Sequence, residues 1–193
     1  MLCYSILPIL SFTSLVAGTT LEDTPAVFAP WEITRLTTFS PSGRPNSSPW
    51  SLINVTITDP NTIPAGQTPT GTAVFEPVIA NCSTAWTFDS DPFNQVFNCT
   101  DIDHGSWTFE MLNDGVESPI ATQNFNLWFK QARKLRTPGG NYSIEFEGTG
   151  QFRIGENMEG ICGGSGVCSF SLKNEAKPFS INQTRTECSG LCG

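Results

Sequence analysis

Basic side chains are scarce in this sequence. Its 193 residues include 10 Lys and Arg against 18 Asp and Glu, which gives a formal net charge of -8. Proteins that bind nucleic acid need a basic surface, because their cations displace counterions from the phosphate backbone. The charge balance therefore excludes nucleic acid as an expected partner.

Histidine is rarer still, and this limits the catalytic chemistry that the chain could carry. His104 is the only histidine, and it lies in the polar segment 101–105. A Ser-His-Asp or Cys-His system needs a histidine that takes the proton from the nucleophile. Because no Gly-x-Ser-x-Gly motif accompanies His104, we interpret it as a loop residue and expect no catalytic residue.

Long apolar runs are absent beyond the first 18 residues, so no membrane-spanning segment and no membrane partner are predicted there. Residues 1–18 hold no charged side chain, and their apolar run ends in small residues, which is typical of a secretory signal peptide. We expect residues 19–193 to form one secreted, extracellular β domain. Its core is predicted at about 31–172, with a cysteine-containing tail at 173–193.

The chain has seven cysteines, and one of them, Cys3, falls in the predicted signal peptide. The others are Cys82, Cys99, Cys162, Cys168, Cys188 and Cys192. An even count in a secreted protein predicts three disulfides, and at this point every connectivity remains open. The spacings Cys-x5-Cys and Cys-x3-Cys differ from the common zinc motif, so we predict disulfides, with no metal site and no cofactor.

Asparagine glycosylation motifs are more frequent than chance predicts. With 13 Asn, and with 40 Ser and Thr among 193 residues, about two or three Asn-x-Ser/Thr motifs are expected, but six occur. Asn46 is the poorest candidate, because Pro49 follows its motif and stiffens the chain. We predict glycosylation at Asn54, Asn81, Asn98, Asn141 and Asn182. Such a set is typical of a secreted eukaryotic protein.

Alternation of apolar and polar residues predicts strands along most of the chain. The predicted strands are 31–39, 50–58, 73–80, 85–88, 93–99, 106–112, 142–147 and 168–172. Residues 59–71 contain three Pro and two Gly without periodicity, and we expect a loop there. Residues 121–136 fit a strand and a helix equally well, and the regular spacing of the other strands favours a strand at 123–130. The sequence thus predicts an all-β fold, a compact antiparallel barrel or sandwich held by disulfides.

Acidic side chains raise two further hypotheses. Segment 89–94, together with Asp101 and Asp103, could hold calcium through oxygen ligands, but it lacks the ligand order of an EF-hand. Glu145 and Glu147 share one face of a predicted strand. That face is usually solvated, so the pairing does not by itself indicate a glycosidase.

Aromatic and basic residues supply the candidate binding surface. Three of the five tryptophans alternate with core-forming residues, which leaves Trp50 and Trp128 as candidates for stacking on a sugar. Four of the ten basic residues fall within seven positions: Lys130, Arg133, Lys134 and Arg136. In an acidic protein this cluster predicts a local positive patch that could meet an anionic partner or a polysaccharide.

The order of several features resembles a known family. They are Trp31 to Leu36, Trp50 to Ile57 with Asp59-Pro60, the pair Cys82 and Cys99 around an aromatic strand, Phe125 to Phe129, and the late pair Cys162 and Cys168. Over about residues 31–172, this order resembles the fungal Alternaria-allergen-like family of small secreted proteins. The resemblance implies a compact antiparallel β-barrel with Cys82–Cys99 and Cys162–Cys168 disulfides, and a role as an allergen or effector that meets host proteins or small ligands.

This chain departs from the family in two respects. Cys188 and Cys192 are additional, and no unpaired cysteine lies near the predicted mature N-terminus. A covalent dimer is therefore not expected, and the sequence leaves the oligomeric state open.

We expect a secreted, non-catalytic, effector-like protein that binds a host extracellular protein, a small ligand or a cell-wall component. The first alternative is a carbohydrate-binding module, which needs Trp50 or Trp128 on an exposed face. The second is a small secreted hydrolase, which needs a cleft that contains His104 and a Ser, or two facing acids.

Overall fold

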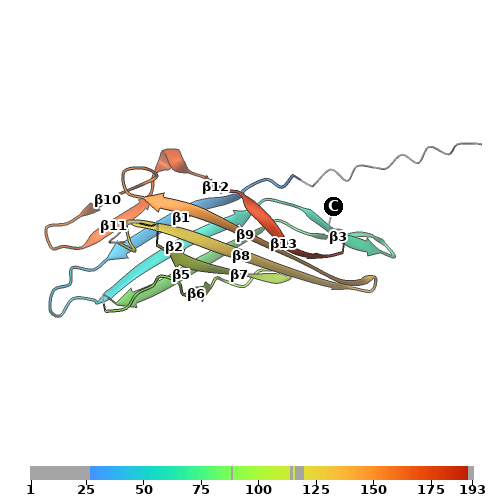
Figure 1. Ribbon diagram of the computed structural model, residues 1–193, viewed down its shortest axis with the longest axis horizontal. Coiled ribbons are helices and arrows are strands. Elements are labelled where there is room, and N and C mark those ends of the chain that lie inside the picture. Colours follow the sequence, from blue (N-terminus) through green and yellow to red (C-terminus); the bar gives the residue numbers. More distant parts are fainter. Residues whose placement is uncertain (1–26, 88, 114, 116–119, 191–193) are drawn as a thin grey trace, which may run out of the picture.

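Strands make up nearly all of the regular structure in the computed structural model, which describes residues 27–87, 89–113, 115 and 120–190 (Figure 1). Within these residues, the short 3₁₀ helix η1 (Asn174–Ala176) is the only helix. None of the described residues form a helix that could cross a membrane. The predicted all-β class is confirmed.

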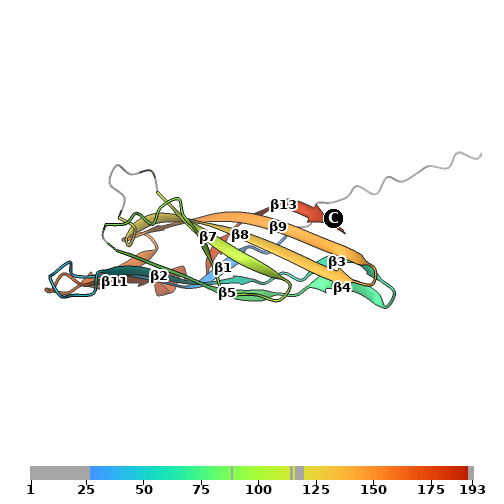
Figure 2. The same cartoon turned by 90° about the horizontal axis from the view of Figure 1, so that it is seen from below.

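Two antiparallel sheets face each other, and the core lies between them (Figure 2). The first sheet contains, in spatial order, β10 (Met158–Cys162), β11 (Cys168–Leu172), β1 (Trp31–Ser40), β2 (Trp50–Asp59) and β5 (Val78–Thr87), and β12 (Phe179–Ile181) also pairs with β1. The second sheet contains β13 (Gln183–Ser189), β9 (Gly140–Arg153), β8 (Asn124–Thr137), β7 (Gly105–Leu112) and β6 (Val96–Asn98). A separate hairpin consists of β3 (Ile63–Thr68) and β4 (Gly71–Phe75).

Period-two alternation sends one face of each main strand into the core. The aromatic side chains Trp31, Trp107 and Phe129 are fully buried there. The ring centroids of Trp31 and Trp107 lie 4.5 Å apart in an edge-to-face arrangement, which joins the two sheets. Trp86 is also buried, so the interpretation of Trp31, Trp86 and Trp107 as core residues is confirmed.

The ambiguous stretch 121–136 is a strand from residue 124 onward, which confirms the strand predicted at 123–130 apart from its first residue. It forms β8, which lies between β7 and β9 in the second sheet. The strand is longer than predicted and continues to Thr137, because its pairing with β9 extends to the turn before Gly140. Beyond residue 130 the buried positions are polar, and so the hydrophobic pattern alone could not reveal this extension.

The prediction of a loop at 59–71 is wrong, because β3 and β4 form a hairpin across this region. Gly66 lies under the ring of Tyr142, where a Cβ atom would meet the ring carbon Cε1 at 2.0 Å. The Tyr142 hydroxyl also donates a hydrogen bond to the Gln67 carbonyl at 2.8 Å. Pro and Gly here mark a tightly packed hairpin and not an irregular loop.

The boundaries predicted for 73–80 and 85–88 are also wrong. The chain ends β4 at Phe75, turns at Glu76 and Pro77, and then continues as one uninterrupted strand, β5. All ten residues of β5 pair with β2. Pro77 has no N–H to donate to a ladder, so the strand break falls there.

The segment after residue 172 contributes strands to both sheets. Within it, β12 pairs with β1 of the first sheet and β13 pairs with β9 of the second. Ile181 packs onto Gly148 and Gly150, where a Cβ atom would meet its side chain at 2.9 Å and 3.0 Å. The predicted core boundary at 172 therefore omits residues that join the two sheets.

Two disulfides match the pairing that the family resemblance implies: Cys82–Cys99 and Cys162–Cys168. The first joins β5 of the first sheet to the residue that follows β6 of the second, and the second bridges paired ends of β10 and β11. Cys188 is disulfide-bonded as well, whereas Cys192, Cys3 and the predicted signal peptide lie outside the described residues. Disulfides of this kind are typical of extracellular proteins.

Candidate functional site

The candidate site lies on the outer face of the second sheet, which we define as the solvent-facing side of β7, β8 and β9. Alternation along β8 directs Trp128, Lys130, Lys134 and Arg136 to this face. These are four of the six residues predicted for a binding patch. The remaining two, Arg133 and Trp50, lie elsewhere.

Arg133 does not belong to an exposed basic patch, and this part of the prediction is wrong. Its position in the alternation points it into the protein, where only 1% of its surface is exposed. The guanidinium lies 5.3 Å from the centre of the Phe75 ring and donates from Nη1 to the Glu76 carbonyl at 3.2 Å. Loss of water around the charge lowers the pKa of Arg133, and the nearby Asp59 carboxylate partly opposes this effect.

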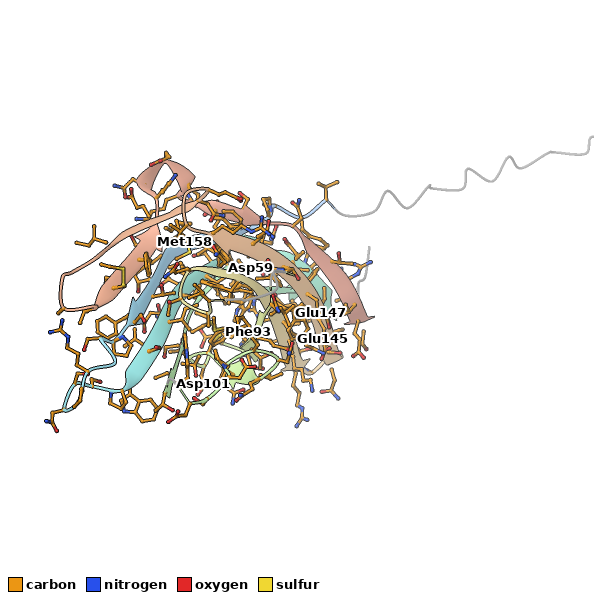
Figure 3. All side chains as sticks on the ribbon, turned by 60° about the vertical axis from the view of Figure 1, so that its left-hand side comes forward. Asp59, Phe93, Asp101, Glu145, Glu147 and Met158 are labelled. Carbon is orange, nitrogen blue, oxygen red and sulfur yellow. A yellow bond between two sulfur atoms is a disulfide. The ribbon has the colours of Figure 1, made fainter. Side chains whose placement is uncertain are left out.

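Lys130 points outward but is neutralised by two carboxylates of the neighbouring strand. Its Nζ lies 2.7 Å from Glu145 Oε2 and 4.0 Å from Glu147 Oε1. Figure 3 shows these two glutamates together on β9. The hydrogen bond that the Lys130 ammonium donates to the Glu145 carboxylate is the main cause that raises the pKa of Lys130. The four basic residues therefore do not form one positive surface.

Lys134 and Arg136 lie farther along β8 and are both exposed. They border a hollow of about 340 Å³ whose other lining residues include Tyr142 and Ser143. Arg136 Nε donates to Asn141 Oδ1 at 3.2 Å, and Asn141 belongs to a predicted glycosylation motif. This end of the outer face is the one that remains positively charged.

Trp50 is half exposed, as predicted, but it is on the other sheet. It lies at the start of β2, where it pairs with Thr87 of β5, and 50% of its surface is exposed. Trp128 lies on β8 of the second sheet. The two tryptophans therefore cannot form one stacking platform.

Trp128 borders a hollow of about 350 Å³, which we call the Trp128 hollow. The residues that line it are Trp128, Glu147, Gly148, Thr149, Asn182, Thr184 and Thr186. They come from three adjacent strands and the residue before β13: Trp128 is paired with Thr149, and Glu147 with Thr184. The arrangement combines an aromatic ring, a carboxylate and several hydroxyl groups on a sheet surface.

This combination suits a sugar ring. An indole offers an apolar surface, while carboxylate and hydroxyl oxygens accept or exchange hydrogen bonds with ring hydroxyls. Trp128 is half-buried, which restricts its rotamers before a ligand arrives. Glu147 is less tightly engaged by Lys130 than Glu145, so its carboxylate remains more accessible.

The sequence indicates Trp128 as a candidate for binding but does not indicate most of the other residues that line the hollow. Glu147 was considered only as half of a carboxylate pair, and the threonines of β13 gave no signal. These threonines lie at the hollow because β13 pairs with β9. Alternation within one strand does not reveal which distant strand it pairs with. A strand prediction for residues 183–189 would have been the earliest clue.

Among the residues that the structure describes, neither His104 nor the pair Glu145 and Glu147 has the arrangement that the hydrolase alternative requires. His104 is exposed in a turn with a positive φ of 60°, and its carbonyl accepts a hydrogen bond from the Lys134 amide. Glu145 and Glu147 hold Lys130 instead of facing each other across a cleft. His104 lines none of the hollows found among the described residues.

The acidic segment considered for calcium borders a hollow of about 480 Å³. Asp89 and Asp91 line it together with Trp86 and Phe93. Across the described part of the chain, no three His, Cys, Asp or Glu side chains gather as a metal-binding group. The calcium hypothesis therefore gains no support from the geometry.

The predicted glycosylation sites are all on the surface. The exposed asparagines are Asn54, Asn81, Asn98, Asn141 and Asn182, and Asn46 is exposed as well. Asn182 lines the Trp128 hollow, and Asn54 and Asn81 line a separate hollow of about 300 Å³ on the first sheet. Each predicted site is thus reachable by solvent.

The fold and the site define a disulfide-bonded, all-β protein with an aromatic and polar hollow on one sheet. No family model matches the chain, and comparisons with curated proteins and with solved structures likewise gave no match. Only the chemistry of the site itself therefore indicates a function.

Proposed function

We propose that this is a secreted, glycosylated, non-catalytic binding protein of the fungal effector or allergen-like type, and that it recognises a neutral cell-wall polysaccharide at the Trp128 hollow. The disulfides and the apolar first 18 residues support secretion. The resemblance of the strand and cysteine order to the fungal family supports the fungal source.

The Trp128 hollow is the observation that carries the binding proposal. One side chain supplies a rigid aromatic surface, and the surrounding Glu147, Thr149 and Thr184 supply hydrogen-bonding groups at its border. Of the two alternatives to a protein partner, the carbohydrate-binding module is the one that this arrangement favours.

The charges near Trp128 favour a neutral polysaccharide over an acidic one. Glu110 is paired with Trp128 across β7, and Glu147 lies one row further along the face. Both carboxylates would repel a polyuronate, whereas they can accept hydrogen bonds from sugar hydroxyls. The exposed cations Lys134 and Arg136 lie six and eight residues away along β8, on the order of 20–25 Å at the usual rise of a strand.

Binding to insoluble polysaccharides tests this function. The secreted protein is incubated with chitin, β-glucan, xylan and polygalacturonate, and the bound fraction is measured. We expect retention on at least one neutral polymer. Trp128→Ala should weaken that affinity about tenfold, or about 1.4 kcal/mol, because it removes the stacking surface.

Trp50→Ala is the matched control, since it removes a half-exposed tryptophan from the other sheet. It should bind as the wild type does. A second control, Lys134→Glu with Arg136→Glu, reverses the positive end of the outer face. Retention only on polygalacturonate, with loss in this charge-reversed variant, would contradict the proposal. Equal affinity of Trp128→Ala and wild type on every polymer would also contradict it.

A further inference from the structure

The Cys82–Cys99 disulfide joins the middle residues of two glycosylation motifs. Cys82 is the central residue of Asn81-Cys82-Ser83, and Cys99 is the central residue of Asn98-Cys99-Thr100. The sequence alone predicts the cysteine pairing and the glycosylation sites as separate features. The structure places them in one unit.

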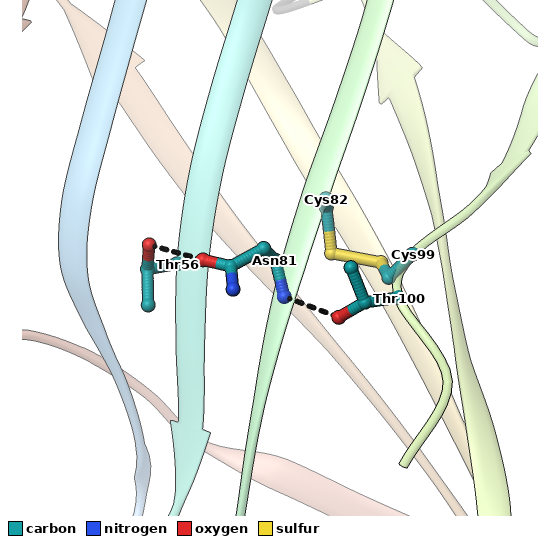
Figure 4. Close-up of a disulfide and its surroundings, with 5 residues drawn as sticks. All are labelled: Thr56, Asn81, Cys82, Cys99 and Thr100. Carbon is teal, nitrogen blue, oxygen red and sulfur yellow. Dashed lines mark hydrogen bonds between the residues drawn. A yellow bond between two sulfur atoms is a disulfide. The ribbon is translucent and has the colours of Figure 1, made fainter.

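The two motifs lie side by side and run antiparallel. Cys82 pairs with Cys99 as an antiparallel bridge, which sets Asn81 of one motif against Thr100 of the other. The Asn81 backbone amide donates to Thr100 Oγ1 at 3.0 Å (Figure 4), and the Thr100 backbone amide donates to the Asn81 backbone carbonyl at 2.8 Å. The hydroxyl that the Asn98 motif requires is therefore engaged by the backbone of the Asn81 motif.

Asn81 is held from its other side as well. Its Oδ1 accepts a hydrogen bond from the Thr56 hydroxyl at 2.8 Å, and its strand, β5, is paired with β2 along its whole length. Cys82 is buried. An enzyme that binds this motif as a free segment would have to break the pairing of β5 with β2 and the pairing of Asn81 with Thr100. It would also have to expose the disulfide.

N-glycosylation forms a bond between the asparagine Nδ2 and C1 of the first sugar. The donor is a lipid pyrophosphate-linked oligosaccharide; the lipid pyrophosphate leaves, and the amide loses one proton. The transferase must hold the asparagine together with the hydroxyl two residues later. Disulfide closure is a separate reaction, in which two thiols lose two protons and two electrons to a disulfide-bearing oxidant that becomes a dithiol.

We propose that these two reactions compete: Asn81 and Asn98 accept a glycan only while Cys82 and Cys99 are still reduced. The cysteines are 17 residues apart, so the disulfide can close as soon as this local segment has been synthesised. Once the disulfide is closed, the hydrogen bonds between Asn81 and Thr100 hold the two motifs together. The occupancy of both sites is then set by the rate of oxidation relative to glycosyl transfer.

The inference rests on the proposed passage of the chain through a glycosylating, oxidising compartment. The other predicted sites, Asn54, Asn141 and Asn182, have no cysteine inside their motifs. They are internal references, because they share the same compartment and the same donor. A control disulfide is also present, since Cys162–Cys168 lies in a segment without a glycosylation motif.

Site-by-site glycan occupancy tests the competition. The full chain is produced in a glycosylating eukaryotic host, and glycopeptides from cells and medium together are quantified by mass spectrometry. Asn81 is measured in Cys99→Ser and Asn98 in Cys82→Ser, so that each motif is measured with its own sequence intact. We expect occupancy at the measured site to rise above wild type, toward that of Asn54.

Cys162→Ser should leave all five occupancies at their wild-type values. A membrane-permeant thiol reductant, added during synthesis of the wild-type chain, should raise the glycan occupancy of Asn81 and Asn98 without any mutation.

Unchanged occupancy at both sites in the variants, while Asn54 carries a glycan, would overturn the inference but leave the proposed glycosylation intact. An equal rise at all five sites would assign the effect to slow folding and would also overturn it. Absence of glycan at every site would instead refute the proposed glycosylation, and the inference with it.

Discussion

The inner and outer sides of β8 place two cations of the same strand in opposite environments. Arg133 points inward, where desolvation lowers its pKa, and Lys130 points outward, where a hydrogen bond with Glu145 raises its pKa. The two residues are only three positions apart. A cluster of basic residues in a strand is therefore not a basic surface, because alternation divides it between solvent and core.

The inner side is also unusual in carrying polar groups within an aromatic core. Asp59 accepts hydrogen bonds from the Asn61 amide at 3.0 Å and from Gln131 Nε2 at 3.0 Å. Gln131 Oε1, Arg133 Nε and the indole nitrogen of Trp107 are buried without a hydrogen-bond partner among the described residues. On the outer side, by contrast, Lys130 and its carboxylates are partly solvated.

Phe129 on the inner side of β8 and Trp128 on its outer side are adjacent, yet their side chains should contribute very differently to the free energy of unfolding. Phe129 is fully buried between the sheets, so Phe129→Ala should cost about 4 kcal/mol through lost burial and the cavity left behind. Trp128→Ala removes a larger side chain from the half-buried outer side and should cost less. Urea unfolding of both variants measures the difference. Equal costs would refute the placement of Trp128 on the outer, solvent-facing side of β8.

Removal of the buried carboxylate should have the next largest effect. Asp59→Asn removes a buried carboxylate that accepts hydrogen bonds from Asn61 and Gln131 and acts electrostatically on Arg133, and it should cost about 2 kcal/mol of unfolding free energy. Arg133→Met removes the charge itself. Asp59→Asn should therefore cost less unfolding free energy in the Arg133→Met background than in the wild type. A double-mutant cycle by chemical denaturation measures this coupling, and strictly additive costs would show that the two groups do not interact.

The exposed ion pair should have the smallest effect. Lys130→Met should cost no more than about 1 kcal/mol, and less at high salt, because exposed pairs are screened. Folding raises the pKa of Lys130, so its stabilising contribution is present below the ordinary lysine pKa and is lost as the pH rises through the higher value in the folded protein.

Thermal unfolding of Lys130→Met and wild type from neutral to strongly alkaline pH measures this dependence. Lys134→Met is the control, because no carboxylate among the described residues lies within ion-pair distance of Lys134. At neutral pH the stability lost in Lys134→Met should be smaller than the stability lost in Lys130→Met. A difference for Lys130→Met that persisted at strongly alkaline pH would show that the lost stability comes from packing and not from charge.

Much of the fold could be predicted, because alternation is a local property. The strands at 31–39, 50–58, 106–112 and 168–172 match β1, β2, β7 and β11 closely. The hairpin β3–β4 was missed, because its Gly66 is required by the ring of a residue 76 positions away, and such a contact leaves no periodic trace. The short strands β10, β12 and β13 were missed because they are too short or too polar to show alternation.

The candidate site was predicted only in part. Trp128 was found because it breaks the pattern of the core tryptophans, but Trp50 was grouped with it although the two lie on different sheets. Arg133 was assigned to the surface because charged residues are usually exposed. A buried polar partner such as Asp59, 74 residues earlier in the chain, could not be anticipated from local sequence.

The sequence by itself determined the all-β class, since the alternation of apolar and polar residues is a short-range pattern, and it supplied six cysteines beyond residue 18. Only the tertiary structure decided which side of each strand meets solvent, which cysteines meet, and which threonines surround Trp128. These outcomes depend on strand register, which pairs residues far apart in the chain. A shift of one residue would exchange the core and the outer face.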